Sequence, residues 1–159
     1  MQMRFVNTYD VNISANSDTS GIWTMGLSTC TFLCIKTKKT IIGWHFGADN
    51  MTGLNMMRIN CLLNSIHDKD VLRVYLVPGI DRDEELAIKK TSRTVKYRPD
   101  TVLTRSRDWL LNYIKIFNWS YKLEVLAHVH HRKELVVFNR QGYTYGRNDD
   151  FHDKLCIQD

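Results

Sequence analysis

Two runs rich in β-branched and aromatic residues, at 30–35 and 40–46, are separated only by the polar residues 36–39. Such residues favour strands, and a short polar connection between two of them predicts an antiparallel hairpin. If Lys36 and Lys39 close a two-residue loop, Cys30 lies directly opposite His45. Directly opposed side chains have Cβ atoms about 4.5–5.5 Å apart, so this register predicts a thiol beside an imidazole. A shift of one residue would turn His45 to the other face of the sheet.

The remaining patterns predict six more strands and three helices. Periodicity predicts strands at 3–6, 11–14, 22–25, 71–77, 123–128 and 134–139, and helices at 52–66, 81–90 and 104–117. We expect the first two strands at sheet edges, the last two to form a second hairpin, and the polar tail from Arg140 to be a loop. This order predicts an α/β sandwich with a mixed, mostly antiparallel sheet flanked by helices.

Length and composition favour one globular domain over residues 1–159, with a monomer as the expected state. No apolar run approaches the roughly 20 residues that a membrane span needs, and no secretory signal is visible at the N-terminus. The four cysteines do not suggest a disulfide framework, so we expect reduced thiols in a cytosol-like compartment. Delivery by a route without a visible signal peptide stays open.

The predicted Cys30–His45 pair has a definite chemical use. Only the thiolate is a competent nucleophile, and an adjacent histidine lowers the pKa of a thiol from its usual value near 8.5. Cys30 also follows a predicted tight turn at Gly26, Leu27, Ser28 and Thr29. Backbone N–H groups of such a turn can stabilise the oxyanion formed when a thiolate attacks an amide carbonyl. The hydroxyl of Thr24 could hold the imidazole in one orientation. Taken alone, each residue is more often structural.

The segment from Thr24 to Cys30, with a hairpin returning to Trp44 and His45, resembles the nucleophile segment of a superfamily of glutamine deamidases. This group includes the cytotoxic necrotizing factors, the Burkholderia lethal factor and the chemoreceptor glutamine deamidases. Thr24, Leu27, Ser28, Cys30 and His45 match its pattern position by position, over about 25 residues. Thr29 departs from the pattern, because the necrotizing-factor form has glycine there.

The resemblance implies a protein-glutamine deamidase, with Cys30 as nucleophile, His45 as base and Thr24 orienting the imidazole. Gly26, Ser28 and Thr29 would shape the oxyanion site, and no metal or organic cofactor is implied. It also implies a bacterial toxin or effector, or one domain of a larger toxin, acting in a host cytosol on a protein such as a GTPase or a translation factor. A thiol protease or a transglutaminase-like acyl transferase is a related alternative.

Two other patterns suggest different functions. His128, His130 and His131, with Asp149, Asp150 or His152, could ligate zinc, although residues 130–133 also resemble a solvated hairpin turn. The net charge of +5 and the basic residues between 89 and 107 could form a phosphate-binding face. A solvated loop has the same composition, so nucleic acid is not the expected partner. A basic binding module for nucleic acid or protein, without catalysis, is the alternative from a different class.

Overall fold

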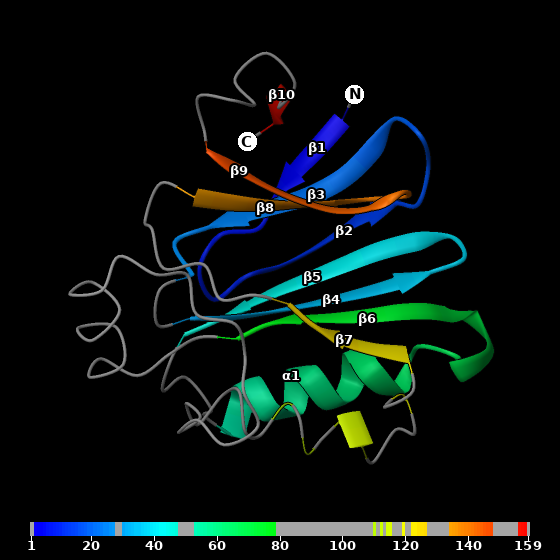
Figure 1. Ribbon diagram of the computed structural model, residues 1–159. Helices are drawn as coiled ribbons and strands as arrows, with labels where there is room; N and C mark the ends of the chain where they lie inside the picture. The colour runs from blue at the N-terminus through cyan, green and yellow to red at the C-terminus, as the bar shows by residue number, and fades with distance from the viewer. Residues whose placement is uncertain are drawn as a thin grey trace.

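The computed structural model describes residues 2–27, 30–47, 53–78, 122–126, 134–147 and 156–158, together with Leu110, Asn112, Ile114, Lys115 and Trp119. In this part of the chain, two five-stranded sheets lie next to each other and one α-helix covers one of them (Figure 1). The sequence predicted a single sheet, and the second sheet is therefore a correction.

The strands of the first sheet, sheet A, run in the spatial order β10 (Cys156–Gln158), β1 (Gln2–Phe5), β3 (Ser20–Met25), β8 (Glu134–Asn139) and β9 (Gly142–Arg147). Those of sheet B run in the order β2 (Val11–Ala15), β5 (Thr40–Phe46), β4 (Thr31–Thr37), β6 (Val71–Val77) and β7 (Leu123–Val125). Three neighbouring pairs are parallel, β1 with β10, β1 with β3 and β6 with β7, and the other five are antiparallel. The prediction of mixed and mostly antiparallel pairing is confirmed.

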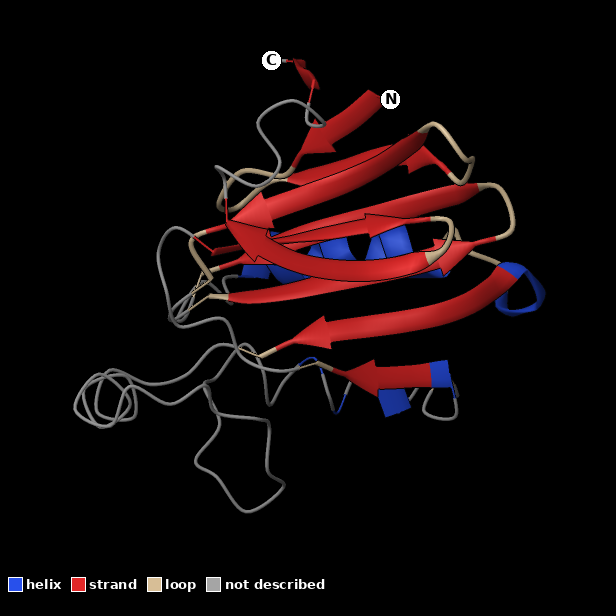
Figure 2. Ribbon diagram, turned by 45° about the horizontal axis from the view of Figure 1, so that its top comes forward, coloured by secondary structure: helices blue, strands red, loops and turns tan. Residues whose placement is uncertain are grey.

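The central strands β4 and β5 of sheet B are buried on both faces, which explains their near-continuous apolar sequences. One face meets sheet A, and the other meets helix α1 (Gly53–Asn64), which lies behind the strands in Figure 2. The core between the sheets contains Val6, Ile22, Leu27, Phe32, Cys34, Ile41, Tyr75, Val77, Leu126, Val136 and Phe138. The core on the helix side contains Leu33, Ile35, Ile42, Trp44, Phe46, Leu63, Val71, Val74, Leu76, Leu110, Ile114 and Trp119.

The β4–β5 hairpin forms, but its register differs by two residues from the predicted one. Lys36 pairs with Ile41, so Thr37 and Thr40 flank the two-residue turn instead of Lys36 and Lys39. Thr37 Oγ1 accepts the backbone N–H of Thr40 at 2.9 Å and that of Lys39 at 3.3 Å, which stabilises the turn at this position. Phe32, not Cys30, therefore lies directly opposite His45.

The second predicted hairpin is wrong. Strand β7 pairs with β6 in sheet B, whereas β8 pairs with β3 and β9 in sheet A. The hairpin partner of β8 is β9, from the segment predicted to be a loop, and β10 also forms there. Asn139 Oδ1 stabilises the β8–β9 turn by accepting the backbone N–H of Gln141 at 3.0 Å and of Gly142 at 3.2 Å. Strand β1 is interior to sheet A, not an edge as predicted.

Of the three predicted helices, the one at 52–66 is confirmed as α1. The prediction at 81–90 lies outside the described residues. Within 104–117, the residues that the structure describes are Leu110, Asn112, Ile114 and Lys115, and all four are helical. Residues 68–70 add a short 3₁₀ turn, η1 (Asp68–Asp70). In the described part of the chain, no helix has the length and apolar character that crossing a bilayer requires.

Side chains of sheet A and sheet B join the two sheets along the outer edge of β2. Arg4 Nη1 donates to the carbonyl oxygen of Ile13 at 2.7 Å, and Asn12 Nδ2 donates to that of Phe5 at 3.1 Å. Asn12 Oδ1 also accepts a hydrogen bond from the backbone N–H of Ile13 at 2.9 Å. Both backbone groups of Ile13 are therefore occupied by side chains.

Gly43 leaves room for the core between the sheets. A Cβ at this position would lie 2.4 Å from Ile22 Cδ1 and 2.6 Å from Phe32 Cζ, both on fully buried side chains. Packed cores relax only partly around an added methyl group. The missing side chain is therefore what lets the ring of Phe32 lie across β5.

We expect Gly43→Ala to lower the free energy of unfolding by about 1–3 kcal/mol, because the buried neighbours cannot move away. Gly47→Ala is the matched control. A Cβ at Gly47 meets the ring of Tyr9 at 2.4 Å, but Tyr9 is 59% exposed and can turn into solvent. Urea denaturation of both variants measures the difference, and equal stabilities would contradict the packing argument.

Candidate active site

Thr24 and His45 come from different sheets and meet in the buried space between them. Thr24 Oγ1 lies 2.8 Å from His45 Nδ1, and both residues are fully buried. Thr24 is on β3 of sheet A and His45 is on β5 of sheet B, so packing of the two sheets creates the contact. The structure therefore brings together two of the three predicted catalytic residues.

A backbone carbonyl sets the proton positions of this pair. Thr24 Oγ1 donates its single hydrogen to the carbonyl oxygen of Val6 at 2.8 Å, because a carbonyl can only accept. The hydroxyl must then accept a hydrogen from His45 Nδ1. His45 is consequently the tautomer with hydrogen on Nδ1 and a lone pair on Nε2. Nε2 is buried and has no hydrogen-bond partner among the described residues, which leaves it available as a base.

Burial keeps this imidazole neutral. Desolvation lowers the pKa of His45 to about 4, against the smaller opposite effect of the nearby Val6 backbone, which raises it. A neutral imidazole carries no positive charge with which to stabilise a resting thiolate. This differs from the expectation of a thiol pKa lowered by a charged neighbour. In this geometry His45 can act by accepting a proton during the reaction.

The backbone of His45 is held by strand pairing on one side and by the turn before β2 on the other. On one side it pairs with Phe32 of β4, whose ring also meets the imidazole edge-on at a centroid distance of 6.3 Å. On the other side His45 N donates to Asp10 O at 3.1 Å, and Tyr9 N donates to His45 O at 2.9 Å. Tyr9 adopts a left-handed backbone with φ of 69°, which is uncommon outside glycine. These contacts restrict the position of the imidazole.

Cys30 lies just before β4 and is half-buried. It packs against the core between the two sheets, the same core that contains Phe32. Phe32 and His45 are directly opposed, so they lie on the same face of sheet B. Cys30 precedes the strand and is therefore not the directly opposed partner of His45 that the sequence predicted.

Gly26 forms the turn between β3 and Cys30 with a positive φ of 73°, a conformation that glycine adopts without strain. A Cβ at this position would have no atom within 4 Å. The requirement for glycine is therefore conformational, as the predicted tight turn implies. Ser28 and Thr29, the other two predicted turn residues, lie outside the described residues.

The residues next to His45 and the other cysteines have structural environments. Trp44 and Phe46 point to the helix side of sheet B, where their rings stack at 5.1 Å. They belong to the core on the helix side of the sheet. Cys34 is fully buried, and burial raises the pKa of its thiol well above the usual range. Cys61 is exposed on α1.

The residues that the sequence suggested as zinc ligands are not among those that the structure describes. His128, His130, His131, Asp149, Asp150 and His152 lie outside the described residues, as does the basic segment 89–107. Within the residues that the structure describes, no three His, Cys, Asp or Glu side chains gather as a metal site would require.

Two contributions to the site were not anticipated from sequence. The carbonyl of Val6 fixes the tautomer of His45, and no sequence signal identifies a single backbone carbonyl. The turn from Asn7 to Asp10 positions the backbone of His45, and its Asn and Asp residues are typical of turns. No protein-family model matches this sequence, and a comparison with curated proteins finds no relative.

The neutral, buried imidazole predicts acid sensitivity of the fold. The pKa of His45 is about 4 in the folded chain and near 6.5 when exposed, so the unfolded chain binds the proton first as pH falls. The free energy of unfolding should therefore decrease between about pH 6.5 and 4, by at most about 1.4 kcal/mol per pH unit.

Urea denaturation at several pH values measures this slope. His45→Asn should flatten it, whereas His67→Asn, which removes an exposed histidine, should not. The same slope in wild type and His45→Asn would show that other groups cause the acid sensitivity.

Proposed function

We propose that the chain is a cysteine-dependent amidohydrolase that deamidates a glutamine side chain of a protein. The observation that carries the proposal is the hydrogen-bonded series Val6 carbonyl, Thr24 hydroxyl and His45 imidazole. Among the described residues, it leaves Nε2 of a neutral histidine as an unoccupied acceptor, on an imidazole that meets the ring of Phe32 in the core against which Cys30 also packs. A purely structural histidine in a core would satisfy both ring nitrogens, because an unpaired buried polar atom costs stability.

The first half of the reaction forms a thioester. His45 Nε2 takes the proton of Cys30 as the sulfur attacks the glutamine side-chain carbonyl, giving a tetrahedral oxyanion. This intermediate collapses with cleavage of the carbon–nitrogen bond, and the imidazolium gives its proton to the departing ammonia. Because His45 rests neutral, proton transfer accompanies the attack instead of preceding it. Thr24 keeps Nδ1 occupied and so directs Nε2 to the reaction; it acts as a positioning residue.

The second half hydrolyses the thioester. His45 accepts a proton from water as the resulting hydroxide attacks the thioester carbonyl. The carbon–sulfur bond then breaks, and the imidazolium returns that proton to the sulfur, which restores the Cys30 thiol and neutral His45 and releases the glutamate product. The turn that begins at Gly26 is the proposed source of backbone N–H donors for both oxyanions, with Ser28 and Thr29 completing it. No step requires a metal or an organic cofactor.

The substrate and setting of the proposal come from the resemblance of residues 24–45 to glutamine deamidases. On that basis we propose a bacterial toxin or effector that acts in a host cytosol on a protein such as a GTPase or a translation factor. A protease or an acyl transferase with the same nucleophile and base would differ in what resolves the thioester, so the reaction product distinguishes them.

Thiol reactivity tests the pairing of nucleophile and base. At pH 7 we expect iodoacetamide to modify Cys30 well before the buried Cys34, because His45 can take the proton as the sulfur attacks. His45→Asn should slow modification of Cys30 by about tenfold or more, while the exposed Cys61 in the same sample reacts at an unchanged rate. Peptide mass spectrometry measures both rates. An unchanged ratio of Cys30 to Cys61 labelling would remove His45 from the mechanism.

The reaction itself is tested on proteins of a host-cell lysate, incubated with wild type, Cys30→Ser or Cys61→Ser. Cys61 is a matched control because it is an exposed cysteine on the far helix. We expect conversion of one glutamine to glutamate with wild type and Cys61→Ser, and a loss of about 1,000-fold or more with Cys30→Ser.

Other products would redirect the assignment. Peptide-bond cleavage that depends on Cys30 would indicate a protease, and attachment of an amine would indicate an acyl transferase. Equal product with Cys30→Ser and wild type would end the proposal of a cysteine nucleophile.

A further inference from the structure

A second polar site lies at the opposite end of strand β4 from the candidate nucleophile. Here an open cavity of about 710 Å³ is bordered by β4 and β6 of sheet B and by the β8–β9 turn of sheet A. Six residues of extended chain separate Cys30 from Lys36, about 20 Å at roughly 3.3 Å per residue. The cavity is therefore distinct from the Thr24–His45 site.

Four basic side chains line this cavity: Lys36, Lys38, Arg73 and Arg140. Lys36 and Arg73 are directly opposed in the β4–β6 pairing, an arrangement of like charges that destabilises a sheet. Burial first, and then the charges of Arg140 and Arg73, lower the pKa of Lys36. Among the described residues, no carboxylate lies within ion-pair distance of Lys36, Lys38 or Arg73. In the described part of the chain, the one carboxylate within ion-pair distance of these four basic side chains is Asp18, beside Arg140.

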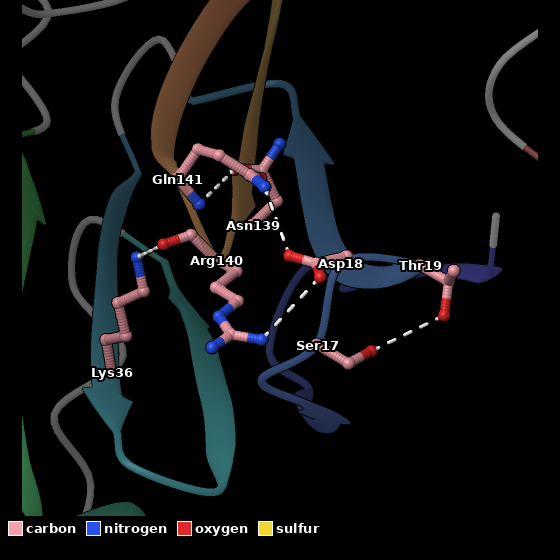
Figure 3. A network of polar contacts seen from close by, with 7 residues as sticks. All are labelled: Ser17, Asp18, Thr19, Lys36, Asn139, Arg140 and Gln141. Carbon is pink, nitrogen blue, oxygen red and sulfur yellow. Dashed lines mark hydrogen bonds and ion pairs between the residues drawn. The ribbon is translucent and has the colours of Figure 1, made fainter.

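Lys36 is only 7% exposed, yet its amine is used once among the described contacts. It donates to the carbonyl oxygen of Arg140 across the gap between the sheets (Figure 3). An ammonium group has three donors, so two remain for another acceptor. The fixed position of a buried cation differs from the mobile lysines of an ordinary solvated surface.

Two carboxylates lie near the rim. Asp18 Oδ2 is 3.7 Å from Arg140 Nη1, and both side chains are more than half exposed, so this ion pair is weak (Figure 3). Glu124 accepts the hydroxyl of Tyr143 at 3.4 Å and neighbours Tyr75 in the β6–β7 pairing. An anion in the cavity would compete with Asp18 for Arg140 and would meet Lys36, Lys38 and Arg73 without such competition.

We propose that this cavity binds a small molecule that carries two or more phosphate groups. Its volume falls in the range of roughly 300–1,000 Å³ usual for small-molecule sites. The four charges converge on one volume from two sheets, which suits a ligand of high local charge. An acidic peptide in extended form would instead need cations spread along a groove, since its side chains on one face repeat about every 6–7 Å.

Isothermal titration of the full chain with sodium tripolyphosphate at low ionic strength tests the site. We expect one ligand per chain. Lys38→Gln and Arg73→Gln should each weaken binding by about tenfold, the loss expected for one charge-assisted contact. Lys39→Gln is the matched control, because Lys39 is in the same turn and removes the same charge but borders a different hollow. Asp18→Asn should tighten binding by releasing Arg140.

Three results would overturn the proposal. The first is no saturable binding by wild type. The second is an equal loss of affinity in Lys38→Gln and Lys39→Gln, which would show attraction by net charge alone. The third is tighter binding of an oligoglutamate peptide of matched charge, displaced by tripolyphosphate, which would assign the cavity to carboxylates. None of these outcomes depends on the chemistry of Cys30.

Discussion

The buried hydrogen bond between Thr24 and His45 depends on nearly every level of the structure. It exists only if sheet A and sheet B pack face to face, because each residue comes from a different sheet. The donor and acceptor of this bond are defined only because Thr24 donates its hydrogen to the carbonyl of Val6. Lys36 makes a similar cross-sheet contact with Arg140 at the other end of β4. The apolar core between the sheets thus lies between two polar links, and a buried polar contact of this kind favours one relative position of the sheets over others.

The sequence predicts those features of the fold that depend on residues within a single strand or helix. The strands β3 to β6 and helix α1 were predicted because their side chains face buried surfaces and show clear periodicity. Strand β9 was not, because Tyr143 and Thr144 are exposed and the segment reads as polar. The sequence also did not predict which sheet a strand joins. β8 pairs with β9, which follows after a two-residue turn, and not with β7, because pairing across a longer connection costs more chain entropy.

The candidate site shows the same division. Residue types and spacing predicted Thr24 near His45, and they predicted Cys30 on the same face. The residue that lies opposite His45 depends on the turn, and the Thr37 hydroxyl favours a turn flanked by Thr37 and Thr40 because it accepts the backbone N–H groups of Lys39 and Thr40. The neutral state of His45 could not be predicted, since it arises from burial by residues distant in sequence. The structure describes Gly26 and Cys30 on either side of the proposed oxyanion turn, and Ser28 and Thr29 between them remain a prediction.

The side-chain bonds along β2 have a consequence for the behaviour of the chain at high concentration. Val11 and Ile13 are more than 40% exposed on an edge strand, and such an apolar edge is a template for strands of other molecules. A strand of another molecule that pairs with β2 would form hydrogen bonds with the N–H and the carbonyl of Ile13. The side chains of Asn12 and Arg4 already bind these two groups. Docking there would first have to break two internal hydrogen bonds, one of them to a guanidinium. Arg4 and Asn12 therefore disfavour pairing of β2 with a strand of another molecule.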